Sequence, residues 1–171
     1  MTTTTRAVDP MIAELDQEAE ATRRMLDRVP GDKLTWKPHP KSMTLGQLAL
    51  HVATVCGSVS NFLEMDAFDV NNASFDPAQP ASKDEILQRF TEEQANAKAK
   101  LESLDNERAM SEWRLTKGET ELWCIPRIAL ARSLMFNHLY HHRGQLSVYL
   151  RLLDVPVPVT YGKSADENPF G

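Results

Sequence analysis

Apolar residues recur every three or four positions in four long stretches of this chain, the spacing that gathers them on one face of an α-helix. The first stretch covers residues 9–28, with Asp9 and Pro10 as a favourable N-cap and first-turn pair. The second covers residues 44–63. It opens on Thr44, with Gln47 three residues later, which is the pattern of a capping box. Both stretches are predicted helices.

Two more helices are predicted in the second half of the chain. Ser82 and Glu85 form another capping-box pattern at the start of residues 82–104. The last helix begins near Pro126 and ends near Leu153, before a proline-rich exit. Between these two helices, short runs on either side of Gly118 leave a small hairpin open as an alternative.

These elements predict an all-α fold, a four-helix bundle built as one domain. The domain spans residues 1–171, and residues 1–8 are expected to be a flexible N-terminus. Residues 68–81, rich in Asn, Asp, Pro and Ala, are predicted to be a connection between the second and third helices.

Charge and cysteine content narrow the class of protein. The net charge of −5 argues against a nucleic-acid partner, because a phosphate backbone requires a basic face. No apolar run approaches the roughly 20 residues that span a bilayer, and the first ten residues lack the apolar region of a secretory signal. With Cys56 and Cys124 as the only cysteines, a reducing cytoplasm is the expected location.

The histidines carry the candidate chemistry. His138 and His142 are four residues apart, so they lie on one face of the last helix and can point to a common metal ion. His51 lies inside the apolar stripe of the second helix and is expected to point inward as a third ligand. The alternative for all three is a buried imidazole that is hydrogen-bonded to a carboxylate or a carbonyl.

Other residues near these histidines have less certain roles. His141 is three residues from His138 and is an alternative ligand to His142, although a position facing solvent or another helix fits better. Gly144 costs about 1 kcal/mol relative to Ala inside a helix, which suggests close approach of a neighbouring backbone. Arg143 and Gln145 are either solvated, support the ligands or bind an anionic substrate.

The remaining candidates have simpler interpretations. His39, in a proline-rich loop, is expected at the surface. Cys56 does not share the helix face of His51, so it is interpreted as a core residue.

Two segments together resemble the signatures of the DinB/YfiT-like metalloenzyme family. Residues 34–53, LTWKPHPKSMTLGQLALHVA, contain a Trp-and-Pro loop, a Gly-Gln-Leu helix start and an inward His. Residues 137–162, NHLYHHRGQLSVYLRLLDVPVPVTYG, contain a His, three residues, then His-Arg-Gly-Gln and a proline-rich exit. The resemblance runs from about residue 10 to the end. It implies a DinB/YfiT-like four-helix bundle with His51, His138 and His142 as metal ligands.

The resemblance leaves the reaction open. Some relatives resemble thiol-dependent S-transferases and isomerases that use mycothiol or bacillithiol, and others resemble metal-dependent hydrolases. Three imidazoles on a tetrahedral ion leave one position for water or substrate. We therefore expect a metal-dependent transferase or hydrolase with a three-histidine site. Zinc or nickel is the expected divalent transition metal, a small molecule the substrate, and a low-molecular-weight thiol a plausible co-substrate.

Two non-catalytic alternatives remain at this stage. One is a stress-related metal-binding protein, and the other is a helical interaction module with hydrogen-bonded core histidines. Exposed apolar positions on the first and third predicted helices would also permit a homodimer.

Overall fold

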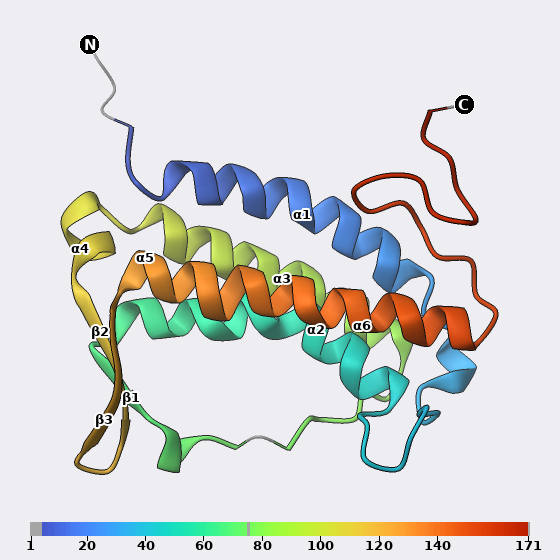
Figure 1. Ribbon diagram of the computed structural model, residues 1–171, viewed down its shortest axis with the longest axis horizontal. Helices are drawn as coiled ribbons and strands as arrows, with labels where there is room; N and C mark the ends of the chain where they lie inside the picture. Colours follow the sequence, from blue (N-terminus) through green and yellow to red (C-terminus); the bar gives the residue numbers. More distant parts are fainter. Residues whose placement is uncertain (1–4, 75, 171) are drawn as a thin grey trace.

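Four long helical segments lie side by side and make up most of the molecule (Figure 1). The computed structural model describes residues 5–74 and 76–170. The first three segments are α1 (Asp9–Asp27), α2 (Leu45–Ser60) and α3 (Lys83–Glu102). The fourth is continuous from α5 (Arg127–Leu130) through a π-helical segment (Ala131–Asn137) to α6 (His138–Leu152). A short helix, α4 (Asn106–Met110), follows α3.

The helix boundaries follow the predicted capping residues closely. Thr44 accepts a hydrogen bond from the Gln47 backbone, and the Gln47 side chain accepts one from the Thr44 backbone, which confirms the capping box of α2. Ser82 caps α3 by accepting from the backbone N–H of Glu85. Helix α1 differs by one position, because its N-cap is Val8.

A small three-stranded sheet corrects the expectation of a strictly all-α four-helix bundle. Strands β2 (Glu112–Lys117) and β3 (Thr120–Pro126) form an antiparallel hairpin, and β1 (Ala67–Asp69) pairs in parallel with β2. The hairpin turns at Gly118, whose φ of +57° favours a residue without a side chain. The fold is therefore mostly helical with a sheet at one end.

Arg127 fixes the sheet to the helices. Its guanidinium is fully buried and donates to the backbone carbonyls of Leu63, Met65 and Glu112 at 3.0, 2.7 and 2.6 Å. It also forms a 2.5 Å ion pair with Asp66. One side chain thus holds both the residues that precede β1 and the start of β2 against the helical layer.

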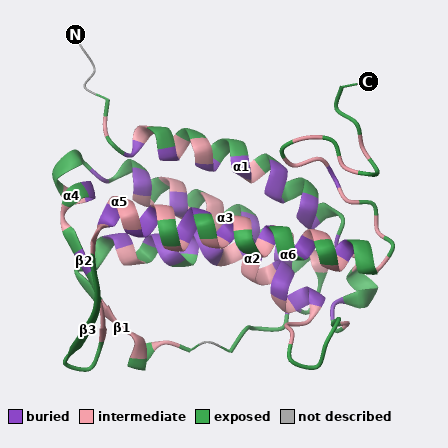
Figure 2. Cartoon of the chain, in the orientation of Figure 1, coloured by how far each residue is buried: buried purple, intermediate pink, exposed green. Residues whose placement is uncertain are grey.

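Helix α2 lies at the centre of the core and packs against α3 and α6 (Figure 2). Gly57 permits the contact with α3, since a Cβ atom there would lie 2.7 Å from the backbone oxygen of Glu93. The position of α2 places His51 beside α6.

The first and last described residues lie on the α1 side of the molecule (Figure 1). Residues 1–4 of the segment expected to be flexible lie outside the described residues. After them, Arg6 donates to the carbonyl of Glu102 at 2.5 Å, and Val8 is buried. Within residues 5–74 and 76–170, no helix combines the length and apolar character needed to cross a membrane.

Candidate metal centre

The structure brings His51 of α2 together with His138 and His142 of α6. One potential ligand atom from each ring lies within 4.8 Å of the other two. The Nε2 atoms of His51 and His138 are 3.2 Å apart, and the ring centroids of His51 and His142 are 4.4 Å apart. All three rings are partly buried, so each keeps some exposure to solvent.

Hydrogen bonds within the fourth helical segment orient two of the imidazoles. Nδ1 of His142 lies 2.7 Å from Oε1 of Gln145, which accepts a hydrogen bond from the Nδ1–H, so Nε2 of the neutral ring carries no proton. The backbone carbonyl of Leu134 accepts a hydrogen bond from the His138 ring. A partner on the far nitrogen is the usual way in which proteins set the tautomer and direction of a metal-binding imidazole.

The surroundings favour neutral rings. Burial lowers the pKa of His51 to about 4, and the nearby His142 and His138 add to this effect by repelling a positive charge. Burial also lowers the pKa of His138 and of His142, although their hydrogen bonds to Leu134 and Gln145 act in the opposite direction. Neutral imidazole is the form that binds a metal ion.

The separation of two of the three ligand atoms fits a transition-metal ion, and all three atoms lie within 4.8 Å of one another. Nitrogen ligands bind zinc at about 2.0–2.1 Å, which places two ligands of a tetrahedral site roughly 3.3 Å apart. The 3.2 Å separation of His51 and His138 agrees with this spacing. The donor set, three imidazoles with no carboxylate in the cluster found among the described residues, suits zinc and nickel.

Two neighbouring residues differ from their expected roles. Arg143 is buried and forms a 2.6 Å ion pair with Glu18 of α1, so it is not solvated, and its charge is already paired with a carboxylate. Gly144 is exposed, and a Cβ atom there would meet nothing within 4 Å. The hypothesis of close backbone approach at Gly144 is therefore wrong, and that approach occurs at Gly57 instead.

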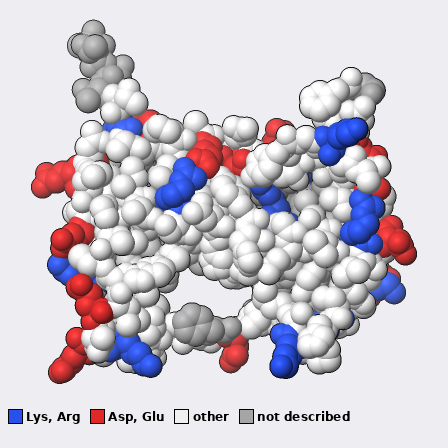
Figure 3. All heavy atoms as spheres, in the orientation of Figure 1, with Lys and Arg blue, Asp and Glu red and all other residues white. Residues whose placement is uncertain are grey.

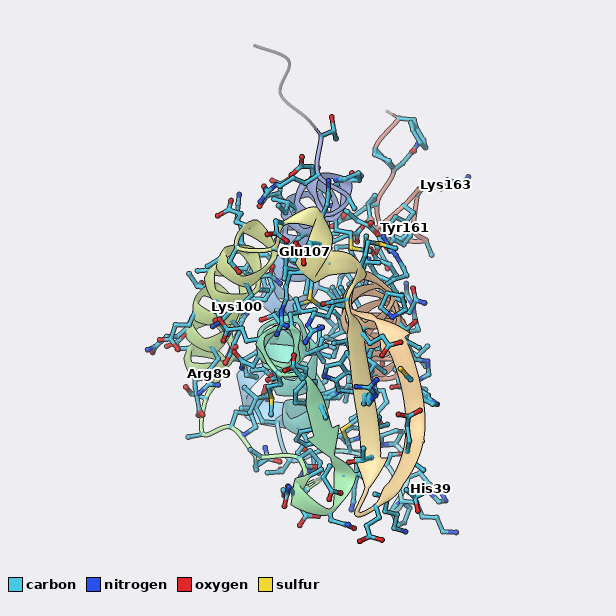
Figure 4. All side chains as sticks on the ribbon, turned by 90° about the vertical axis from the view of Figure 1, so that its left-hand side faces the viewer. His39, Arg89, Lys100, Glu107, Tyr161 and Lys163 are labelled. Atoms are coloured by element: carbon cyan, nitrogen blue, oxygen red, sulfur yellow. The ribbon has the colours of Figure 1, made fainter. Side chains whose placement is uncertain are left out.

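The other neighbours agree with the sequence analysis. His141 is exposed, and it contacts the cluster only through its ring, whose centroid is 4.8 Å from that of His142. Cys56 is buried in the core, where desolvation raises its pKa to about 12. His39 is exposed in the loop before α2, at the lower edge of the molecule in Figure 4.

Two pockets border the histidines, and neither could be predicted from sequence patterns. The first, here called the polar pocket, has a volume of about 250 Å³ and is lined by His51 together with Gln47, Thr54, Glu85 and Arg89. The second, here called the apolar pocket, reaches His138. Residues of the connection between α2 and α3 line both pockets, including Val70 and Ala78. Figure 3 shows the surface hollowed below the helices, between the sheet and the loop before α2.

Comparison with known proteins identifies the family. YrdA, an uncharacterized protein of Bacillus subtilis strain 168, is 22% identical over 162 residues, which cover 95% of this chain and 92% of YrdA. A DinB-like protein from Bacillus cereus has a similar structure, with a TM-score of 0.67, 22% identity, and coverage of 87% of this chain and 94% of that one. The DinB-like protein YjoA of Bacillus subtilis gives a TM-score of 0.69 at 18% identity, with coverage of 90% of this chain and 97% of YjoA.

The family model agrees with these relatives and covers most of the chain. It is the model of the DinB superfamily, and it matches residues 14–146, a range that contains all three clustered histidines. This chain belongs to the DinB superfamily.

Proposed function

We propose that this protein is a metal-dependent enzyme that uses His51, His138 and His142 to bind one divalent transition-metal ion, zinc or nickel. The observation that carries the proposal is the convergence of three neutral, partly buried imidazoles from two helices. Three histidine ligands leave an open position on a tetrahedral ion, as in catalytic rather than structural zinc sites.

The proposed reaction is a transfer or a hydrolysis on a small molecule. When bound, the metal supplies a Lewis acid that lowers the pKa of a water or thiol at its open position. The protein contributes the orientation of the ligands through Gln145 and the Leu134 carbonyl. The polar pocket beside His51 supplies room and hydrogen-bonding groups for a polar co-substrate.

A low-molecular-weight thiol is the preferred co-substrate. Neither cysteine of the chain is expected to act as this thiol. Cys56 is buried in the core, and its raised pKa keeps it protonated, while Cys124 lies on β3, a strand that supplies none of the three histidines. Both cysteines are unpaired, which supports a reducing compartment such as the cytoplasm, where such thiols are abundant.

Cobalt substitution tests this proposal. Co²⁺-loaded protein should develop a thiolate-to-cobalt charge-transfer absorption band when 2-mercaptoethanol is added, and the His51→Ala variant should not. Zinc- and nickel-loaded proteins should then consume the thiol in the presence of an electrophile such as monochlorobimane, or hydrolyse activated esters.

The outcomes separate the alternatives. Ester hydrolysis without a thiolate band would favour the hydrolase. Bound cobalt with no band and no turnover of either kind would contradict the enzyme proposal and favour a non-catalytic metal-binding protein. Absence of cobalt binding would contradict the site itself.

A further inference from the structure

The apolar pocket lies between the sheet and the end of α2, and it ends at a histidine of the cluster. Its volume is about 480 Å³. Phe68 of β1, Leu115 of β2 and Trp123 of β3 form its sheet side. Leu134 and His138 line it from the fourth helical segment.

The size and lining of this pocket match a small organic ligand. Pockets that bind such ligands usually have volumes of about 300–1,000 Å³ and mostly apolar walls with a few polar groups. No Lys, Arg, Asp or Glu lines this pocket among the described residues. A charged ligand would therefore lose its hydration without gaining an ionic partner.

Four large aromatic side chains contribute to the wall, namely Phe62, Phe68, Trp113 and Trp123. The rings of Phe62 and Phe68 have centroids 4.6 Å apart and are tilted by 36°. Trp123 lies directly across the hairpin from Leu115 and remains 47% exposed, so its ring is accessible to a ligand from solvent. Flat aromatic ligands can pack against such rings in stacked or edge-on arrangements.

From this geometry we infer a substrate class: the apolar pocket binds an uncharged aromatic small molecule whose reacting group lies at the His138 end. The inference rests on the metal-dependent function proposed above. The two pockets then have separate roles. The aromatic substrate enters from the sheet side, and the polar co-substrate approaches from the His51 side.

A fluorescent probe tests the pocket directly. N-phenyl-1-naphthylamine is neutral and aromatic, and its fluorescence increases in an apolar site. It should bind metal-free, full-length protein saturably with one site per chain. The Leu115→Gln variant, which places an amide in the pocket wall, should bind it about tenfold more weakly.

Leu122→Gln is the matched control. Leu122 is on the same hairpin and is 45% exposed, but it does not line the pocket. This variant should bind the probe like the wild type. Thermal melting of both variants by circular dichroism shows whether each is folded. Equal binding by wild type and a folded Leu115→Gln variant, or no saturable binding by wild type, would overturn the inference.

A paramagnetic metal tests the position of the pocket relative to the histidines. Protons of the bound probe should relax faster in Co²⁺-loaded protein than in Zn²⁺-loaded protein, because the pocket reaches His138. Equal relaxation would place the probe elsewhere and overturn the inference. If the protein binds the probe but no metal, the proposed function fails while the pocket remains. If it binds one metal per chain but no probe, only the pocket assignment fails.

Discussion

The three histidines differ in their hydrogen bonds and in how far burial lowers their pKa. His138 and His142 each donate a hydrogen bond along their own helix, to the Leu134 carbonyl and the Gln145 side chain. His51 comes from α2, and burial lowers its pKa further, to about 4. The cluster therefore combines two oriented rings with one that strongly resists protonation.

Metal-free protein should lose stability as the pH falls from about 6.5 to about 4. In this window an unfolded His51, with the ordinary pKa of 6.5, binds a proton that the folded residue does not bind. The unfolded state is then favoured progressively as the pH falls, and the contribution levels off below both pKa values. His138 and His142 act in the same direction.

The His51→Gln variant should lose less stability than the wild type over the same pH range. Urea unfolding of chelated wild type and variant at several pH values between 7 and 4 checks this prediction. The same pH dependence in both proteins would show that His51 titrates normally in the folded state.

Sequence spacing was enough to identify the candidate ligands but not the roles of their neighbours. The i, i+4 interval of His138 and His142, and the apolar stripe around His51, led to a group that the structure brings together. Arg143 and Gln145 were indistinguishable from sequence. Only the packing of α6 against α1 shows that Arg143 is buried against Glu18, while Gln145 reaches His142.

At the level of elements, two helical glycines should respond in opposite ways to the same substitution. Gly57→Ala should destabilise the protein, because the new methyl group would lie 2.7 Å from the Glu93 backbone oxygen on α3. Overpacking of this kind costs about 1–3 kcal/mol. Gly144→Ala should stabilise the protein by up to about 1 kcal/mol, since Ala favours the helix and the site is open.

The urea concentration at the unfolding midpoint, measured for wild type and both variants, tests these two predictions. Similar stabilisation by both substitutions would show that α2 and α3 leave room for a methyl group at Gly57. Destabilisation by Gly144→Ala would show that another element covers that side of α6.

The helices were predictable because periodicity and capping are local signals, whereas the sheet depends on distant pairing. The capping box at Thr44 marks the start of α2 within the sequence itself. Strand β1 has only three residues and pairs with β2 more than 40 positions away, at Ala67 and Arg114. The π-helical segment before His138 could not be predicted either, because the spacing of apolar residues does not distinguish a π-helix from an α-helix. Short π-helical segments often occur near functional sites.

On the scale of the whole molecule, α6 connects the histidine cluster to a buried ionic contact with α1 and the C-terminal segment. Arg143 donates to Glu18 at 2.6 Å and to the Tyr161 hydroxyl at 2.5 Å. Figure 4 shows Tyr161 on the C-terminal segment beside the helices, far from His39. These contacts should support the fold rather than the chemistry.

Arg143→Met should therefore lower the free energy of unfolding by about 3–5 kcal/mol, because it leaves the Glu18 carboxylate buried without its cationic partner. Arg151→Met, which removes a more exposed ion pair with Asp166 from the same helix, should change it by less than about 1 kcal/mol. Chemical denaturation measures both, and metal content should be unchanged in each folded variant. Similar effects of the two substitutions would contradict the stabilising role of the buried pair.

We propose that His51, His138 and His142 bind one metal ion on a scaffold that folds without it. Elemental analysis of untagged protein, purified without chelator and incubated with zinc or nickel, tests this claim most directly. We expect about one ion per chain in the wild type and in His141→Ala, and loss of tight binding in His51→Ala, His138→Ala and His142→Ala. Circular dichroism should show that chelation preserves the helices and lowers the melting temperature, because a ligand of the folded state stabilises it. A wild type without metal, or metal lost from His141→Ala but retained by His142→Ala, would show that these three histidines do not form the metal site.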